Sequence, residues 1–332
     1  APGHRSRPYV VRSVPRPLGD AVSLQRKFYL RPNLLSRYRT VIVDKEKPGA
    51  AQEIVLTRDE LTKMPGTQGD PTRVVLTLPG VSRSPFGFGY YIVRGASFEN
   101  TGFFIDGHPA LFLYHLLGGP GVIHPELIGR ITFYPGGYPA SYGRFATGVI
   151  SVETKAPPTD RWHLDVEVDV LKAGVLFSTP FDDKKGQLTL AFRKSYYEVL
   201  LPAFAPDVSL SYLDYQMRLS YAFTPKLRFK LLTMGAEDSF GSQAGATSRS
   251  SDTAESDFSL GFHRVNAALE WDISSKLRWT NSVMWEYDHT SSFRTAEEDE
   301  DVKFGLKGWF MQWRSFFEWK PTSNFKFQAG LD

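Results

Sequence analysis

The chain has 332 residues, with 39 lysines and arginines against 36 aspartates and glutamates, and 42% of its residues are hydrophobic. It contains no cysteine, which excludes disulfide scaffolds, thiol catalysis and cysteine-ligated zinc or iron–sulfur sites. No run of ~18 apolar residues occurs, so the sequence predicts no membrane-spanning helix. These totals suit a soluble two-domain protein, but the residues are distributed unevenly along the chain.

Two shifts in composition divide the chain. Residues 1–40 carry nine basic side chains and one acidic side chain, so this arm has a charge of +8 while the other 292 residues sum to −5. A basic arm can bind nucleic acid or an anionic membrane, but no nucleic-acid motif accompanies it, so a solvated linker is favoured. Of the 22 prolines, 17 precede residue 160, whereas all seven tryptophans follow it. Paired prolines within residues 155–160 therefore mark a boundary.

Residues 56–155 alternate glycine-rich segments with short apolar strands. Thr57, followed by Asp59 and Glu60, predicts the start of a helix, and residues 71–78 predict a second short helix. Apolar stretches at 91–95, 103–107, 131–134 and 148–153 predict strands. The zone is therefore expected to be a compact α+β unit.

After residue 160 the sequence alternates strictly between apolar and polar residues. Residues 212–223 show it best, with apolar side chains at odd positions, and residues 226–231, 264–273 and 309–320 repeat it. This period of two predicts strands with one apolar and one polar face. Short turns are expected at 182–186, 224–226, 274–276 and 321–324, and longer loops at 201–208, 237–257 and 289–302.

Two architectures carry such strands. A soluble antiparallel sandwich is one, but its strands usually have ~5–6 residues, whereas these run to a dozen or more. Aromatic residues gather where the strands meet the short turns, as in the girdle of a transmembrane barrel. Long strands, short turns at one end and long loops at the other favour the transmembrane barrel.

Several motifs in the middle zone carry a family resemblance. They are Leu-Pro-Gly-Val at 78–81, Val-Arg-Gly at 93–95, Asp-Gly-His-Pro at 106–109, Tyr-Pro-Gly-Gly at 134–137, Tyr-Gly at 142–143 and Gly-Val-Ile-Ser-Val-Glu-Thr-Lys at 148–155. In this order and spacing they resemble the plug domain of TonB-dependent outer-membrane receptors. One departure is Thr147-Gly148, where members often carry a glycine pair, and it affects only a turn.

The resemblance implies an α+β plug domain followed by antiparallel transmembrane β-barrel strands, which form an incomplete barrel in this chain. We expect residues 1–55 to hold the basic arm and the end of a small β-domain, residues 56–157 the plug, and residues 158–332 about nine barrel strands. Nine strands are too few to close the barrel of this family, and an open sheet edge is not tolerated in lipid. The chain is therefore expected to be the N-terminal part of a longer protein.

The resemblance also implies three groups of site residues. A coupling box just before the plug, suited to strand addition to a partner, would be Thr40, Val41, Ile42, Val43 and Asp44. A latch between plug arginines and inward carboxylates of the first barrel strand would be Arg94, Arg144, Asp165, Glu167 and Asp169. Ligand-binding candidates near the plug apex would be Phe86, Phe88, Tyr90, Phe112, Tyr114 and His115. Each group has an alternative interpretation that stays open. The box could be an ordinary edge strand, the arginines could be solvated in the lumen, and the aromatic residues could pack against barrel loops.

No catalytic residue, cofactor or metal site is predicted. His108, His115 and His124 lie close in sequence, but no carboxylate pattern accompanies them as metal ligands, and no nucleophile–base pair or phosphate loop occurs. The expected function is ligand uptake through a plugged barrel in the bacterial outer membrane. Expected partners are outer-membrane lipids, a TonB-type energy-coupling protein in the periplasm, an unidentified small molecule or peptide, and a surface lipoprotein, but no nucleic acid. The alternative is a structural scaffold that uses a plugged barrel without transport.

Overall fold

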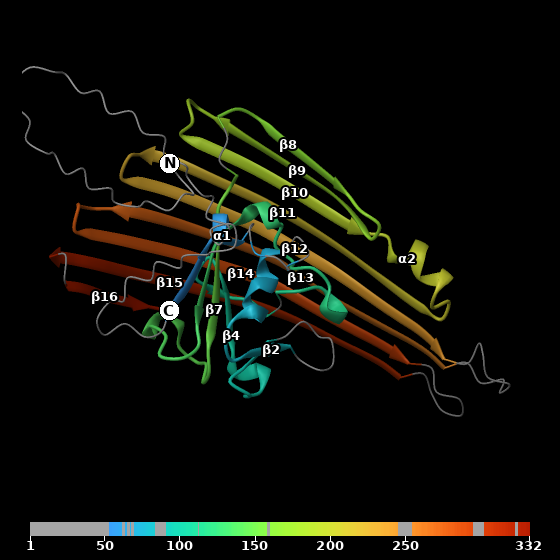
Figure 1. Cartoon of the computed structure of the whole chain (residues 1–332). Helices are drawn as coiled ribbons and strands as arrows, with labels where there is room; N and C mark the ends of the chain where they lie inside the picture. The colour runs from blue at the N-terminus through green and yellow to red at the C-terminus, as the bar shows by residue number, and fades with distance from the viewer. Residues whose placement is uncertain are drawn as a thin grey trace, which may run out of the picture. The chain divides into compact units, whose positions relative to one another are not determined.

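The computed structural model describes residues 53–332 apart from 62–63, 65–66, 68–69, 84–90, 112, 158–159, 245–253, 295–301 and 323–324. The basic arm and the expected coupling box at residues 40–44 lie outside this described part. Within it, no helix has both the length and the apolar character needed to cross a membrane. We call the part before residue 158 the plug segment and the long sheet that follows the wall (Figure 1).

The plug segment is built on a small mixed sheet. Its strand order is β1-β6-β7-β4-β5, in which β4 and β7 are parallel and the other neighbours are antiparallel. These strands are β1 (Ile54–Thr57), β4 (Gly102–Ile105), β5 (His108–Pro109), β6 (Ile128–Tyr134) and β7 (Val149–Thr154). A separate hairpin joins β2 (Val81–Arg83) to β3 (Tyr91–Val93).

Short helical turns connect the strands of the plug segment. They are α1 (Arg58–Leu61) and the 3₁₀ helices η2 (Pro71–Thr77), η3 (Phe98–Asn100), η4 (Leu116–Gly118), η5 (Pro125–Leu127) and η6 (Ala140–Tyr142). The two predicted helix starts are confirmed. Glu60 accepts hydrogen bonds from the backbone N–H and hydroxyl of Thr57, both at 2.8 Å. Asp70 caps η2 by accepting from the Thr72 N–H at 2.9 Å.

Apolar residues of the plug sheet form one core with residues of the wall. Leu127, Ile131 and Phe133 are fully buried, and the cluster that contains them continues into Leu176 and Met234 of the wall. Apolar burial thus stabilises both the plug segment and its contact with the wall.

The wall is a nine-stranded antiparallel sheet in simple sequence order, from β8 to β16. Its strands are β8 (His163–Val168), β9 (Lys172–Phe181), β10 (Gly186–Ser195), β11 (Val208–Thr224), β12 (Leu227–Ala244), β13 (Ala254–Asp272), β14 (Leu277–Arg294), β15 (Val302–Thr322) and β16 (Phe325–Leu331). Between β10 and β11 lie α2 (Tyr197–Leu200) and η7 (Leu201–Ala203). In the described part of the chain the sheet is open, with β8 and β16 at its edges, as the sequence predicts.

The described residues of two predicted loops, 237–257 and 289–302, belong to strands. Residues 237–244 extend β12, residues 254–257 begin β13, and residues 289–294 extend β14. These extensions are rich in serine and charged residues, which is why the sequence pattern assigned them to loops. Backbone pairing continues through them regardless, for example between Ser239 and Ser259.

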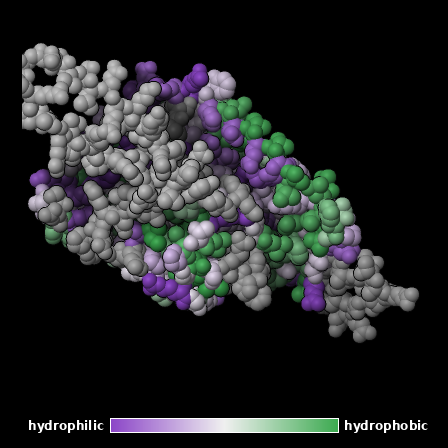
Figure 2. All heavy atoms as spheres, in the orientation of Figure 1, coloured by the Kyte–Doolittle hydropathy of each residue, from purple (hydrophilic) through white to green (hydrophobic). Residues whose placement is uncertain are grey.

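The two faces of the wall differ in polarity. In β11–β15 the even-numbered side chains face the plug segment and the odd-numbered ones face away from it, because successive residues of a strand point to opposite sides. Buried polar residues of the first kind are Asp214, Gln216, Arg218, Asp238, Arg264, Asn266, Glu286, Gln312 and Arg314. Exposed apolar residues of the second kind are Phe223, Trp271, Val283, Trp285, Trp309, Met311, Trp313, Phe317 and Trp319. Figure 2 shows hydrophobic residues gathered along the margin formed by β8–β10, interleaved with hydrophilic ones.

Candidate functional site

The polar contact between the plug segment and the wall is the candidate functional site. Its centre is His115, which is 1% exposed and stacks on Tyr212 with ring centroids 4.1 Å apart. Its Nδ1 lies 2.6 Å from Asp238 and its Nε2 lies 3.0 Å from Asp214. Burial disfavours the charged imidazole, but the two carboxylates outweigh it and raise the pKa of His115. The plug therefore presents a cation to two wall carboxylates.

Arg193 completes this charged cluster from β10. Its guanidinium bonds Asp214 at 2.9 and 3.1 Å and donates to the Gly121 carbonyl at 2.6 Å. The side chain is 1% exposed and Asp214 is fully buried. Two cations and two carboxylates are thus enclosed together, which satisfies charges that would be costly to bury singly.

Next to this cluster, the side-chain amide of Gln216 binds the plug backbone with the two hydrogen bonds that a paired strand would otherwise supply. Gln216 accepts a hydrogen bond from the His124 N–H and donates to the Val122 carbonyl, each at 2.7 Å. The His124 ring itself is buried, and desolvation, assisted by the charge of Arg193, lowers its pKa to about 3. The wall therefore meets a neutral imidazole here, in contrast to the charged His115.

Further along the wall, arginines bind plug carbonyls. Arg264, paired with Glu286, donates to the Pro109 carbonyl at 2.5 Å. Arg314 donates to the carbonyls of Gly107 and Ser141. In these contacts the charge belongs to the wall and the plug supplies backbone acceptors, which hold the plug without fixing its side chains.

Two more plug side chains are held between wall strands. His108 lies 2.9 Å from both Gln312 and Ser282, and its burial lowers its pKa to about 4. Arg218 donates to the Thr154 hydroxyl at 3.1 Å. The three neighbouring histidines of the plug therefore bind different wall partners rather than one metal ion.

The structure does not bring the predicted latch residues together. Arg94 and Arg144 are exposed, with φ of 53° and 80°, and form no ion pair among the described residues. Glu167 and Asp169 pair with Lys172 of the adjacent strand instead. Leu164, Val166 and Val168 are exposed on the opposite face of β8.

Only two of the six ligand-binding candidates lie within the described residues. Tyr114 is 7% exposed, with its ring edge-on to Tyr91 at 5.3 Å, and His115 is the buried cation of the plug–wall cluster. Phe86, Phe88, Tyr90 and Phe112 fall outside the described part. Both described candidates are thus buried in contacts within the protein.

A cavity of about 420 Å³ lies between the plug segment and the part of β14 and β15 around Glu286, Asp288 and Phe310. Its lining combines aromatic rings with carboxylates, namely Phe103, Phe145, Phe310, Glu99, Glu286 and Asp288. Sequence analysis missed it, as it missed Arg193, Asp238, Arg264 and Arg314. The usable signal was parity, because the last three occupy even positions of their strands.

These features define a class of protein: a small glycine-rich domain held by polar residues against the inner face of a long-stranded antiparallel wall. Residues 45–150 match the family model of the TonB-dependent receptor plug domain. The chain thus carries a plug domain of the TonB-dependent receptor type, which confirms the resemblance seen in the sequence, and the solved receptors described next share its fold. Members of this family are transporters of the outer membrane rather than enzymes.

Solved structures show the same fold at low sequence identity. The siderophore receptor PirA from Acinetobacter baumannii superposes with a TM-score of 0.57 at 18% identity, covering 80% of this chain and 45% of that one. The copper transporter OprC gives 0.54 at 12% identity, covering 82% and 53%. P. aeruginosa FpvA, solved with pyoverdines, gives 0.50 at 12%, covering 86% and 45%. The chain spans about half the length of these receptors, and no protein of curated function matches its sequence.

Proposed function

We propose that this chain is part of an outer-membrane receptor that takes up a ligand through a plugged β-barrel, driven by a TonB-type protein in the periplasm. The observation that carries the proposal is the two-faced wall. Its inner face binds the plug through reversible hydrogen bonds and ion pairs, and its outer face offers an apolar band to lipid.

The dimensions of the outer face suit a membrane. Strand register aligns Trp271, Trp279 and Phe317 in one aromatic row near the short turns. Eight residues further along β13, His263 lies in a row with Tyr287 and Trp309. Eight residues span ~27 Å of strand, or ~20 Å across a bilayer at a tilt of ~40°, close to the ~25 Å apolar band of outer-membrane barrels.

Polar residues begin directly beyond the second row. Glu237 and His289 lie on either side of Gly261 and meet across it at 3.0 Å. The following row contains Ser239, Ser259 and Ser291, aligned on three adjacent strands. Since unpaired polar groups are excluded from hydrocarbon, this change supports an outer boundary of the membrane at the His263 row.

Uptake requires the plug to move within a barrel that stays closed around it. The described plug–wall contacts suit this requirement, because the wall charges bind backbone carbonyls or a paired histidine and can exchange these partners for water. The proposed handle for movement is the segment at residues 40–44, which would add as a strand to the energising partner. The cavity between plug and wall is the proposed place for a ligand to pass. The ligand is a small molecule or peptide, and a surface lipoprotein would assist its capture.

Because this chain contains no cysteine, a single introduced cysteine can detect contact with the TonB-type protein by forming a disulfide. We expect Ile42→Cys to form a disulfide in cells with cysteines placed in the periplasmic domain of the TonB-type protein. Val22→Cys, placed upstream in the arm, is the matched control and should not. An adduct at neither position, with assembly of partner proteins intact, would instead favour a structural scaffold without transport.

A further inference from the structure

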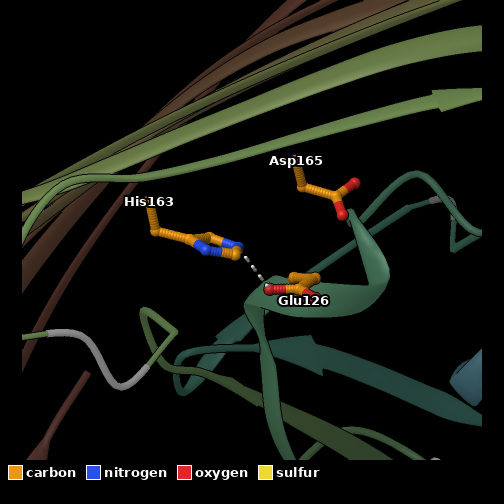
Figure 3. A group of neighbouring side chains, drawn as sticks. All are labelled: Glu126, His163 and Asp165. Atoms are coloured by element: carbon orange, nitrogen blue, oxygen red, sulfur yellow. Dashed lines mark ion pairs between the residues drawn. The ribbon is translucent and has the colours of Figure 1, made fainter.

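A second group of ligating side chains lies at the seam where the plug segment meets the first wall strand. Glu126 comes from η5, and His163 and Asp165 come from β8. One ligand atom from each residue lies within 4.8 Å of the other two. The His163 Nε2 is 3.7 Å from a Glu126 carboxylate oxygen, and Figure 3 shows the three side chains converging from the two parts of the chain.

The local structure fixes this arrangement from both sides. His163 and Asp165 are two residues apart on β8 and so share one face of the strand. They pair with Ser178 and Leu176, which are fully buried, so this face of β8 is the one turned toward the plug. The convergence therefore follows from strand register rather than from chance side-chain positions.

The backbone at Glu126 is held as firmly as that of β8. Arg58 donates to the Glu126 carbonyl at 2.5 Å and to the Ile128 carbonyl at 3.1 Å. Gln216 of the wall holds the His124 N–H two residues earlier. The side chains themselves stay partly exposed, at 41% for Glu126 and 42% for His163, while the His163 Nε2 atom is buried at the seam.

The charges of the group call for a cation. Two carboxylates, from Glu126 and Asp165, approach each other across the seam. Glu167 on the same strand, and Asp169 directly after its end, pair with Lys172. At Asp165 the nearest basic group of the cluster is an imidazole whose Nε2 has no hydrogen-bond partner among the described residues. An imidazole nitrogen and two carboxylates that converge on one point are suitable ligands for a divalent metal ion.

We propose that Glu126, His163 and Asp165 bind a divalent first-row transition metal ion of the zinc type. Bonds of ~2.0–2.2 Å place tetrahedral ligand atoms ~3.3 Å apart, so each side chain moves by only ~1 Å to close on the ion. The imidazole selects zinc, copper or nickel over magnesium and calcium, which prefer oxygen ligands alone. Water completes the coordination at this half-exposed site.

The consequence is a metal-dependent link between plug and wall. Two ligands belong to the wall and one to the plug, so the bound ion ties η5 to β8 near the end of the sheet that carries the short turns. This inference does not rest on transport, and it holds equally for a scaffold.

The test is zinc binding by the full natural protein in detergent after treatment with a chelator. Calorimetric titration with ZnCl₂ should detect a site whose affinity falls at least tenfold in His163→Ala, Asp165→Asn and Glu126→Gln. Titration with CoCl₂ should give visible absorption bands of a bound ion that these variants lack. Glu167→Gln, on the same face of β8 but paired with Lys172, is the matched control and should bind as the unaltered protein does.

Zinc should also raise the thermal midpoint of the unaltered protein and of the control, but not of the ligand variants, because an ion that binds only the seated plug stabilises it. His163→Gln keeps the size and polarity of the side chain and serves if His163→Ala does not fold. Equal zinc affinity in the unaltered protein and the ligand variants would overturn the proposal. So would absence of zinc binding to the unaltered protein.

Discussion

The plug segment and the wall bury their side chains in opposite ways. The plug encloses apolar residues such as Leu127 and Phe133 in its centre, as a small globular domain does. The wall encloses polar residues such as Arg193 and Asp214 and leaves tryptophans exposed on its far side. The difference shows that the plug provides hydrogen-bond and ion-pair partners for the polar inner face of the wall, while the outer face is suited to an apolar medium.

The charged cluster should be the most sensitive point of this contrast. Asp214→Ala leaves Arg193 and His115 enclosed with one carboxylate fewer, and breaking a buried ion pair costs ~3–5 kcal/mol. We expect a loss of this size in the free energy of plug unseating, measured by denaturant-dependent protease cleavage of the plug. Asp272→Ala removes an exposed pair with Arg278 and should change it by only ~0–1 kcal/mol. Equal effects of the two variants would refute the assigned roles.

The plug core provides the apolar half of the comparison. Leu127→Ala creates a cavity at a fully buried position and should destabilise the plug by ~2–5 kcal/mol. Leu164→Ala, on the exposed face of β8, makes no such cavity and should have a much smaller effect in detergent. The denaturant midpoints of the two variants, measured by tryptophan fluorescence of the wall, compare the two losses of stability. A larger shift for Leu164→Ala would contradict the assignment of the two faces.

Arginine substitutions along β13 sharpen the position of the apolar band. Val265→Arg places a charge between the two aromatic rows and should cost ~2–4 kcal/mol in lipid vesicles. Ser259→Arg lies beyond the His263 row and should cost ~0–1 kcal/mol. Folding yields into vesicles, read from the heat-dependent gel mobility of folded barrels, measure the difference. Similar costs at both positions would place the band elsewhere.

Acid should loosen the plug through His108 and His124. Their pKa values of about 4 and about 3 lie below the ordinary value of 6.5, because burial disfavours the charged ring. The unseated state therefore binds protons first as pH falls, so stability is lost below pH ~6.5 and the loss levels off near the seated pKa values. At pH 4 each histidine lowers the free energy of plug unseating by on the order of 2–3 kcal/mol.

His115 has the opposite sign, because its raised pKa adds stability that is present below pH ~6.5 and lost as pH rises through the seated value. His108→Asn should flatten the acid limb of the stability profile, whereas the unaltered protein should show it. An unchanged acid limb in His108→Asn and in the matching His124 variant would exclude these groups as its cause.

Strand pattern predicted the faces of the wall but not its partners. Alternation at residues 212–223 placed Asp214, Gln216 and Arg218 on one face, and all three are buried against the plug. It ended β12 too early because Ser239 and Asp238 are polar on both faces beyond the apolar band.

The plug–wall pairs could not be predicted in the same way. His115 meets Asp214 and Asp238 across ~100 residues or more of sequence, and only the seating of one segment on the other sets that register. Glu167 and Asp169, expected to meet Arg94, pair instead with Lys172 of the adjacent strand. Domain boundaries at 55–56 and 157–158 stay predictions, as does the coupling box.

The central claim is that in β11–β15 the odd-numbered residues face lipid while the even-numbered residues face the plug. Spin labels on single cysteines at residues 264 to 269 of β13, in lipid vesicles, measure it residue by residue. The account predicts oxygen accessibility that is high at 265, 267 and 269 and low at 264, 266 and 268, with little access of a water-soluble nickel complex to either set. Accessibility without this period of two, or odd positions open to the nickel complex, would contradict it.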